Sequence, residues 1–327
     1  MFVPRFGIVV PLAIVAFAAT LRAAPIVTPV VKIDEKPAAL EITIDGKPFT
    51  TYRFAPTPDD PAFHRPYFYP VRSDDGLELT SDQWRLQQKQ PTAAAKKKID
   101  HPHQRSVWVG HGDVNGADHW THKDKENEQQ RHIKFTSVGD DSFIEELTWD
   151  SKQPDKPVLS ETRTVKIIAY DDGARAIDVT SKLKAVNGDA VFKVKPLNVS
   201  GVEAGWLAAR VAPSISAGVK DRKSRITSSA KATGEKEARE KPATWCDYSG
   251  PIDGKTYGIA LFDDPRNPGH PTPFHVRNFG LLTHIGVHDW TLKEGQSQTL
   301  RHRLIFHPGD ATSAHLDERY EAFAEEK

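Results

Sequence analysis

The sequence contains one cysteine, no excess of charge of either sign and one long apolar run. Cys246 has no partner in the chain, which excludes an internal disulfide as a source of stability. The 44 basic and 44 acidic side chains balance, so no long-range field is available to gather nucleic acid or an anionic membrane surface. We therefore expect no nucleic-acid partner and a fold stabilised by its own hydrophobic core.

The long apolar run lies at the start of the chain. Residues 6–19 follow Arg5 and precede small residues near Ala24, a pattern typical of a secretory signal peptide. The run is shorter than the roughly 20 residues that a spanning helix needs. We predict that residues 1–23 are a signal peptide and that the protein is exported, periplasmic or secreted, with no integral membrane span after processing. An uncleaved tether is the alternative, because Arg22 stands where a small residue is preferred.

Short alternating runs separated by turn residues dominate the rest of the chain. The clearest is residues 39–52, where Asp45-Gly46 separates two such runs and predicts a hairpin. Further strands are expected at 143–149, 161–170, 176–183, 191–194, 255–262 and 298–307. A helical period appears at 313–325, where Thr312 or Ser313 would cap a terminal helix.

These patterns predict an all-β fold: a large antiparallel β-sandwich, similar to a supersandwich, with a short C-terminal helix. After roughly 23 residues are removed, the length fits one large β domain, which we place at residues 24–327. Residues 87–98 and 220–241 are rich in polar and charged side chains, and we predict that both are solvated loops.

Two segments concentrate the polar residues that could carry chemistry. Residues 100–120 hold His101, His103, Arg105, Trp108, His111, Asp113, Asn115 and Trp120. In an extended chain the first three would project to the same side, and glycines 110, 112 and 116 would let the backbone bring His111 and Asp113 back toward them. Residues 245–277 hold Trp245, Asp247, Asp263, His270, His275 and Arg277, and prolines 265, 268, 271 and 273 stiffen the connection between Asp263 and His275.

Histidine side chains are the candidate catalysts, because imidazole titrates near neutral pH. We predict proton transfer by His103, His111 and His275, with Asp113 orienting an imidazole and Arg277 stabilising developing negative charge. Guanidinium forks, carboxylates, amides and tryptophan faces would bind the substrate. The residues in this group are Arg105, Trp108, Asn115, Trp120, Arg210, Trp245, Asp247, Asp263 and His270. A structural role for any of them stays open.

A divalent metal is the alternative use of the same histidines. His101 and His103 could chelate from one strand face, with His111 or Asp113 as a third ligand and an open fourth position. Hydrogen-bonded imidazoles in a polar pocket would have the same residue pattern, so the cofactor stays open.

Two other histidine pairs are set aside. His284 and His288 would share a helix face, but Gly286 and the β-rich surroundings disfavour a helix. His302 and His307 fall in a terminal strand, and we predict that they are surface or packing residues.

The two polar segments also carry a family resemblance. Asp-His-Pro-His and Gly-His-Gly-Asp-Val-Asn-Gly in the first, and His-Pro-Thr-Pro-Phe-His-Val-Arg in the second, resemble the signature of the PmoA-like family, bacterial proteins often labelled methane oxygenase. The resemblance covers about residues 65–307. It implies an exported β-sandwich similar to carbohydrate-active sandwiches and a carbohydrate or sugar-derived small molecule as partner. Gln104 and His119 depart from the pattern, so neither inherits a role.

The leading hypothesis is an exported carbohydrate-active enzyme that uses His, Asp and Arg acid-base chemistry, as in a lyase, epimerase or hydrolase. The two segments would meet across the sandwich to form its pocket. The alternatives are a metal-dependent oxidative or hydrolytic enzyme and a non-catalytic glycan-binding sandwich.

Overall fold

The computed structural model describes residues 1, 28–121, 128–153, 155–194, 205–217, 223–286 and 288–326. Apart from Met1, the predicted signal peptide lies outside these residues. All strand pairings between the named strands are antiparallel, and they form two eight-stranded sheets and one two-stranded sheet. The prediction of a largely antiparallel β fold with a short C-terminal helix is therefore confirmed.

The first large sheet has the order β1 (Val31–Lys36), β2 (Ala39–Ile44), β3 (Lys47–Arg53), β4 (Tyr67–Val71), β5 (Val107–Val109), β11 (Leu207–Arg210), β16 (Leu281–His284) and β15 (Phe274–Arg277). The second has the order β12 (Arg225–Ser228), β13 (Trp245–Ile252), β14 (Lys255–Asp263), β18 (Ser297–Pro308), β9 (Arg175–Ala185), β8 (Leu159–Ala169), β7 (Ser142–Trp149) and β6 (Gln130–Val138). The small sheet pairs β10 (Ala190–Phe192) with β17 (Trp290–Leu292).

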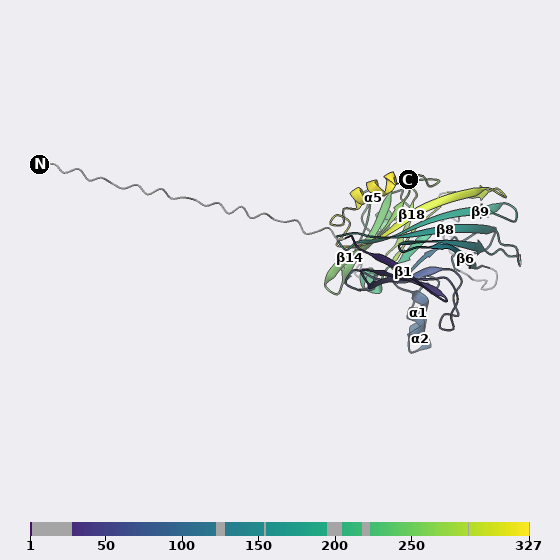
Figure 1. Cartoon of the computed structure of the whole chain (residues 1–327), viewed down its shortest axis with the longest axis horizontal. Helices are drawn as coiled ribbons and strands as arrows, with labels where there is room; N and C mark the ends of the chain where they lie inside the picture. Colours follow the sequence, from purple (N-terminus) through teal and green to yellow (C-terminus); the bar gives the residue numbers. More distant parts are fainter. Residues whose placement is uncertain are drawn as a thin grey trace.

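One hydrophobic core joins the two large sheets. Alternate side chains of each strand point inward, so Ile42 and Phe68 from the first sheet belong to the same buried cluster as Val165 and Ile177 from the second. Figure 1 shows the layer of β8, β9 and β18 lying across the layer that contains β1. The architecture is a β-sandwich in which alternation along the sequence sets the buried face.

The predicted hairpin at residues 39–52 is confirmed. β2 pairs with β3, and Asp45 and Gly46 have φ angles of 51° and 74°. Positive φ at both positions is the requirement of the type I′ turn, which explains why Asp-Gly stands there. The remaining strands predicted from alternation overlap strands of the structure, from β7 to β18, although the predictions at 161–170 and 191–194 run past the ends of β8 and β10.

The two predicted loops contain short elements. α1 (Gln83–Gln88) and α2 (Ala93–Lys96) occupy much of 87–98, and the side chains of Asp82 and Thr92 cap them. β12 and α4 (Glu235–Ala238) interrupt 220–241, because Ile226 and Ala238 are buried there. Each element is too short for hydrophobic periodicity to detect.

The terminal helix starts later than predicted. α5 (Leu316–Glu325) follows His315, whose φ is 52°, and Ser313 closes a turn with Asp310 instead of capping the helix. Leu316 and Phe323 bury against the outer face of the second sheet. The helix lies on that face in Figure 1. A fifth helix, α3 (Pro213–Ala217), follows β11.

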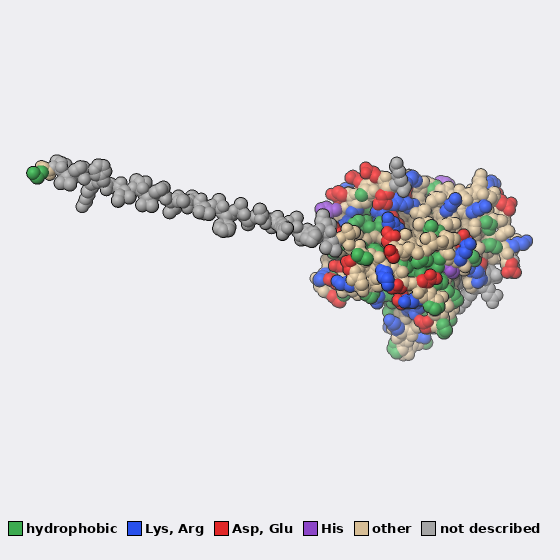
Figure 2. Space-filling view, in the orientation of Figure 1, with side chains coloured by type: hydrophobic (Ala, Val, Ile, Leu, Met, Phe, Trp, Pro, Cys, Tyr) green, Lys and Arg blue, Asp and Glu red, His purple; other side chains and the backbone are tan. Residues whose placement is uncertain are grey.

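The visible surface carries both charge signs interspersed, in keeping with the balanced composition (Figure 2). No helix among the described residues is both long enough and apolar enough to cross a membrane.

Candidate histidine–aspartate site

A cavity of about 200 Å³ lies where the two large sheets meet. Asp263 at the end of β14 and His302 on β18 line it from the second sheet, and His284 at the end of β16 lines it from the first. His111 and Trp206 complete the wall nearest the first polar segment. The expectation that the two polar segments meet across the sandwich is met here by His111 and Asp263.

Strand register brings the three polar side chains into the core. Asp263 and His302 are direct partners in the β14–β18 ladder, and directly opposed side chains share a face. Leu261, two residues before Asp263, and Leu304, two residues after His302, both belong to the hydrophobic core. The period of two therefore points Asp263 and His302 inward.

The resulting group is compact and buried. One potential ligand atom from each of Asp263, His284 and His302 lies within 4.8 Å of the others. The imidazole centroids of the two histidines are 4.5 Å apart, and none of the three residues is more than 4% exposed.

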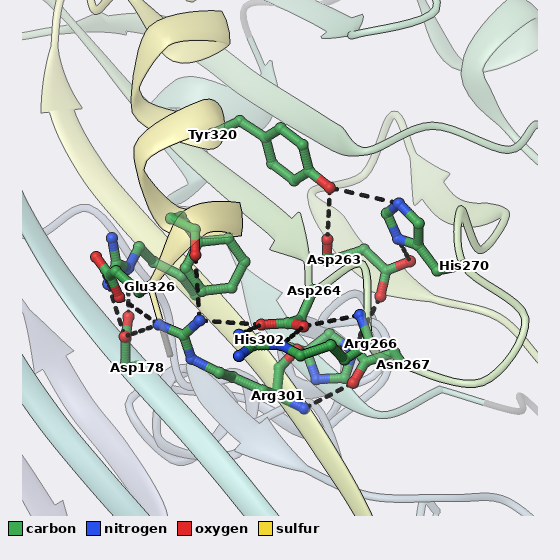
Figure 3. Close-up of polar contacts among 12 residues, drawn as sticks. Asp178, Asp263, Asp264, Arg266, Asn267, His270, Arg301, His302, Tyr320 and Glu326 are labelled. Atoms are coloured by element: carbon green, nitrogen blue, oxygen red, sulfur yellow. Dashed lines mark hydrogen bonds and ion pairs between the residues drawn. The ribbon is translucent and has the colours of Figure 1, made fainter.

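A loop wraps the Asp263 carboxylate in hydrogen bonds (Figure 3). Its Oδ2 accepts from the backbone N–H and the hydroxyl of Thr272 and from Nδ1 of His270, each at 2.9 Å. Its Oδ1 accepts from Nδ2 of Asn267, also at 2.9 Å. A carboxylate can only accept hydrogen bonds, so all four contacts are donations to it. Together they fix the carboxylate in position.

These bonds determine the tautomer of His284. The Thr272 hydroxyl hydrogen is directed to Asp263, so the 3.0 Å contact between Thr272 Oγ1 and His284 Nδ1 requires that Nδ1 carry the hydrogen. Nε2 is then a bare lone pair, and it is buried with no hydrogen-bond partner among the described residues. Burial lowers the pKa of His284 to about 3, which keeps the ring neutral at physiological pH.

His302 also has a ring nitrogen outside the hydrogen bonds of the described residues, although no bond fixes its tautomer. Its Nε2 lies 3.2 Å from Nδ2 of Asn267 and 3.6 Å from Oδ1 of Asp263, while its Nδ1 is buried without a partner in the described part of the chain. Burial, together with the neighbouring His284, lowers the pKa of His302 to about 3. Each imidazole therefore keeps one buried nitrogen that no group among the described residues uses.

Two neutral imidazoles and a carboxylate are ligand types that divalent transition metals accept. The unused nitrogens fit this chemistry, because a ligating histidine typically donates its other ring N–H to a neighbour, as His284 does to Thr272. Three protein ligands beside a cavity would leave a coordination position open. The group could therefore hold a metal ion.

The metal ligands predicted from the sequence are not brought together. His101 and His103 lie near each other, with ring centroids 5.6 Å apart, but His111 lines the cavity. Its Nδ1 and Nε2 lie 3.3 Å and 3.2 Å from the carbonyl oxygens of Gly205 and Lys193. Among the described residues, the potential ligand atoms converge at Asp263, His284 and His302 instead.

Several predicted site residues make contacts within the protein near the first segment. Asp113 accepts a hydrogen bond from the Gly116 N–H, and Asn115 bonds to the backbone beside β10. Buried Arg105 pairs with Asp60 at 2.8 Å and with a second carboxylate, that of Asp82, at 2.7 Å.

The predicted tryptophans pack inside the protein. Trp108 and Trp120 contact each other with centroids 5.2 Å apart, and both are at most 1% exposed. Trp245 is buried under α5, where its Nε1 donates to Asp317. Asp247, two residues along β13, is paired with the buried His307 at 3.0 Å.

A second polar cluster surrounds the Phe279 ring. His101 stacks on this ring at 4.7 Å, and its Nδ1 lies 2.9 Å from Asp100. The chain is not extended here, because φ of His101 is 45°. Arg210 pairs with Asp100 at 2.8 Å, and its guanidinium lies 4.8 Å from the phenyl centroid. Burial opposes ionisation of Asp100, but the contacts with His101 and Arg210 lower its pKa to about 2.

β15 carries two predicted catalysts, and one of them reaches this cluster. The Arg277 guanidinium lies 5.0 Å from the Phe279 centroid, and its Nε donates to Glu235 at 2.9 Å. His275, 2% exposed, alternates with the core residues Phe274 and Val276 and therefore faces away from the sandwich core. Of the predicted catalysts, His111 therefore lines the cavity and Arg277 packs on Phe279.

No functional role was predicted from the sequence for His284 or His302, the two histidines of the buried group. A usable signal was present, because His302 stands between Leu300 and Leu304 in an alternating strand, at a position that faces the core. His284 carries no comparable signal, since its strand is four residues long and its neighbours across the sheets are distant in sequence.

Fold and site together define an antiparallel β-sandwich with a buried carboxylate–imidazole group beside a cavity between its sheets. The chain belongs to DUF6807, a family of unknown function whose model matches residues 39–321. No match was found among curated proteins. The resemblance to the PmoA-like family stays a prediction.

The solved structures that match this chain have low sequence identity to it and low structural similarity. Heparan sulfate lyase HepC from Pedobacter heparinus has a TM-score of 0.41 and 11% identity, over 86% of this chain and 37% of that one. A polysaccharide lyase has a TM-score of 0.37 and 9% identity, over 90% and 34%. A GalM/aldose epimerase homologue from C. elegans has a TM-score of 0.31 and 7% identity, over 86% and 99%. The chain spans about a third of the length of the two lyases, and at these TM-scores the likeness says nothing about activity.

Proposed function

We propose that this protein is a metal-dependent enzyme in which Asp263, His284 and His302 hold a divalent transition metal. The observation that carries the proposal is the pair of buried, unused imidazole nitrogens beside a fixed carboxylate at a cavity. A bound metal would supply Lewis-acid activation of a substrate oxygen or of water. The protein's own part is to keep both imidazoles neutral and to hold Asp263 in place through its four donors.

The substrate class we propose is a carbohydrate or a sugar-derived small molecule. The cavity wall includes Trp206, Trp290 and Leu300, which offer apolar surface, and polar groups such as Asn267 and His288. Trp290 stacks on Phe192 at 3.8 Å, which fixes its ring. Aromatic faces suit the apolar face of a sugar ring, and the motif resemblance to the PmoA-like family supports the same class.

Elemental analysis of the full-length protein, purified without chelator, tests the metal site. We expect close to one metal ion per chain, lost in His284→Leu and His302→Leu but kept in His315→Leu, whose side chain is 71% exposed. Zinc would favour a hydrolytic reaction and iron an oxidative one. Folded wild-type protein that contains no metal and takes up none from zinc or iron solutions would refute the proposal.

The Phe279 cluster supports a second candidate function, metal-free acid-base chemistry on the same substrate class. Asp100 fixes the His101 imidazole through Nδ1, and the Arg277 guanidinium packs on the same phenyl ring. An oriented imidazole near a guanidinium can transfer a proton and stabilise developing negative charge. Turnover of acidic sugars lost in His101→Asn but kept in His284→Leu would favour this function, and the reverse result would exclude it.

Export of the protein is part of the proposal and is independent of the site. The supporting observation is the pattern of Arg5, residues 6–19 and the small residues near Ala24. Mass spectrometry of the protein recovered from its native compartment should give a mature N-terminus near Ala24. An intact Met1 terminus on exported protein would favour the tether.

A further inference from the structure

Helix α5 reaches the histidine–aspartate site through one side chain. The helix packs on the outer face of the second sheet, whereas the Asp263 carboxylate points to the inner side. The Tyr320 hydroxyl extends from α5 to the end of β14, where it lies 3.1 Å from the Asp263 carbonyl oxygen and 3.4 Å from His270 Nε2 (Figure 3). A single hydroxyl thus touches both the backbone of a proposed metal ligand and the histidine that bonds its carboxylate.

The direction of the hydrogen bonds can be assigned from the acceptors. His270 Nδ1 lies 2.9 Å from Asp263 Oδ2, and a carboxylate only accepts, so Nδ1 carries the hydrogen. The Tyr320 hydroxyl has a single hydrogen, which it donates to the carbonyl oxygen of Asp263, and the hydroxyl also lies 3.4 Å from His270 Nε2. Tyr320 therefore holds the backbone of Asp263, and His270 holds its carboxylate.

Helix α5 also contacts Asp264, the residue after Asp263, indirectly through Arg301. Asp264 pairs with Arg301 at 2.9 Å, and the Arg301 guanidinium packs 4.1 Å from the Phe323 ring and contacts Glu326. The loop that begins at Asp263 is therefore attached to α5 by an aromatic-cation contact and an ion pair as well as by Tyr320. These additional attachments should keep the helix in place when the hydroxyl alone is removed.

We propose that Tyr320 and His270 are positioning residues, through which α5 sets the orientation of the Asp263 carboxylate toward His284 and His302. This inference rests on the proposed metal site for its functional meaning. Outer hydrogen-bond partners of metal ligands typically change metal affinity by about 10–100-fold when removed. Tyr320→Phe should lie near the lower end of that range, because Thr272 and Asn267 still hold the carboxylate.

The test uses the full chain and two readouts. In metal-free protein with ¹⁵N-labelled histidine, NMR should show His270 protonated at Nδ1, and Tyr320→Phe should move its Nε2 resonance. Calorimetric titration with Zn²⁺ should show about 10-fold weaker binding in Tyr320→Phe, and weaker binding in His270→Gln as well. Glu321→Gln, an exposed change on the same helix, is the matched control and should leave both readouts unchanged.

The outcomes separate the two proposals. If wild-type protein binds no metal but the His270 resonance moves, the metal site fails and the contact between Tyr320 and His270 stands. If wild-type protein binds Zn²⁺ and Tyr320→Phe binds it equally well, the positioning role is overturned and the metal site stands. An unmoved resonance in Tyr320→Phe would also overturn it.

Discussion

Acidification should destabilise this protein through three buried, uncharged histidines. Burial lowers the pKa of His119, His284 and His302 from 6.5 to about 3 in each case. Between these values the unfolded chain binds a proton that the folded chain does not, so the free energy of unfolding falls as the pH drops from about 6.5 toward 3. Above about pH 6.5 the three groups contribute no pH dependence.

The size of the effect follows from linkage. Each histidine adds about 1.4 kcal/mol per pH unit to the slope within this window. From pH 6 to pH 4 a single histidine therefore costs about 2.5 kcal/mol, and three together cost about 7.5 kcal/mol. This loss is comparable with the whole stability of a typical domain, roughly 5–15 kcal/mol. We expect the metal-free protein to unfold in mild acid.

His119 isolates one contribution without touching the proposed ligands. Its ring lies 5.0 Å from that of Trp149 and is fully buried, so His119→Phe keeps an aromatic ring there. Urea unfolding of metal-free protein, followed by tryptophan fluorescence at pH 7, 6, 5 and 4, should give a variant slope lower by about 1.4 kcal/mol per pH unit. His315→Gln, an exposed control, should keep the wild-type slope. Equal slopes for His119→Phe and wild type would refute the reasoning.

Three further predictions concern stability and reactivity. Gly258→Ala places a Cβ 2.3 Å from the His307 ring, and we expect a loss of about 2 kcal/mol and a lower Tm; an unchanged Tm would contradict this. Arg105→Gln leaves buried carboxylates without their cation and should cost about 3–5 kcal/mol in urea unfolding, whereas Arg131→Gln, 49% exposed, should cost under about 1 kcal/mol. Burial raises the pKa of the Cys246 thiol, so a thiol reagent should label it only after unfolding, and rapid labelling of folded protein would be inconsistent with this burial.

The strands were predictable because their information is local. Alternation and an Asp-Gly turn define the hairpin of β2 and β3 without reference to the rest of the chain. The start of α5 was not predictable in the same way. Ser313 is a suitable cap by residue type, but its side chain bonds to Asp310, and the choice between the two depends on how Leu316 packs.

The candidate site required long-range information that the sequence does not contain. Asp263 and His302 meet because β14 pairs with β18, a register that no local pattern specifies. His284 joins them from the opposite sheet, which depends on how the two sheets pack. The local density of histidine around His101 and His103 indicated a site on residue type alone, although the structure places the His101 ring on Phe279 and the His103 ring beside His101.

The buried imidazoles also distinguish a ligand site from a structural one. A buried polar atom without a partner costs about 1–3 kcal/mol, and His284 Nε2 is such an atom among the described residues. His284→Leu removes this atom and keeps a similar volume, while the Thr272 hydroxyl stays bonded to Asp263. We therefore expect the metal-free variant to be more stable than wild type by about 1–3 kcal/mol in urea at pH 7, and to gain no stability from added Zn²⁺, whereas wild type does. A variant less stable than metal-free wild type would mean that His284 stabilises the sandwich by itself, and the case for a ligand role would lose its physical basis.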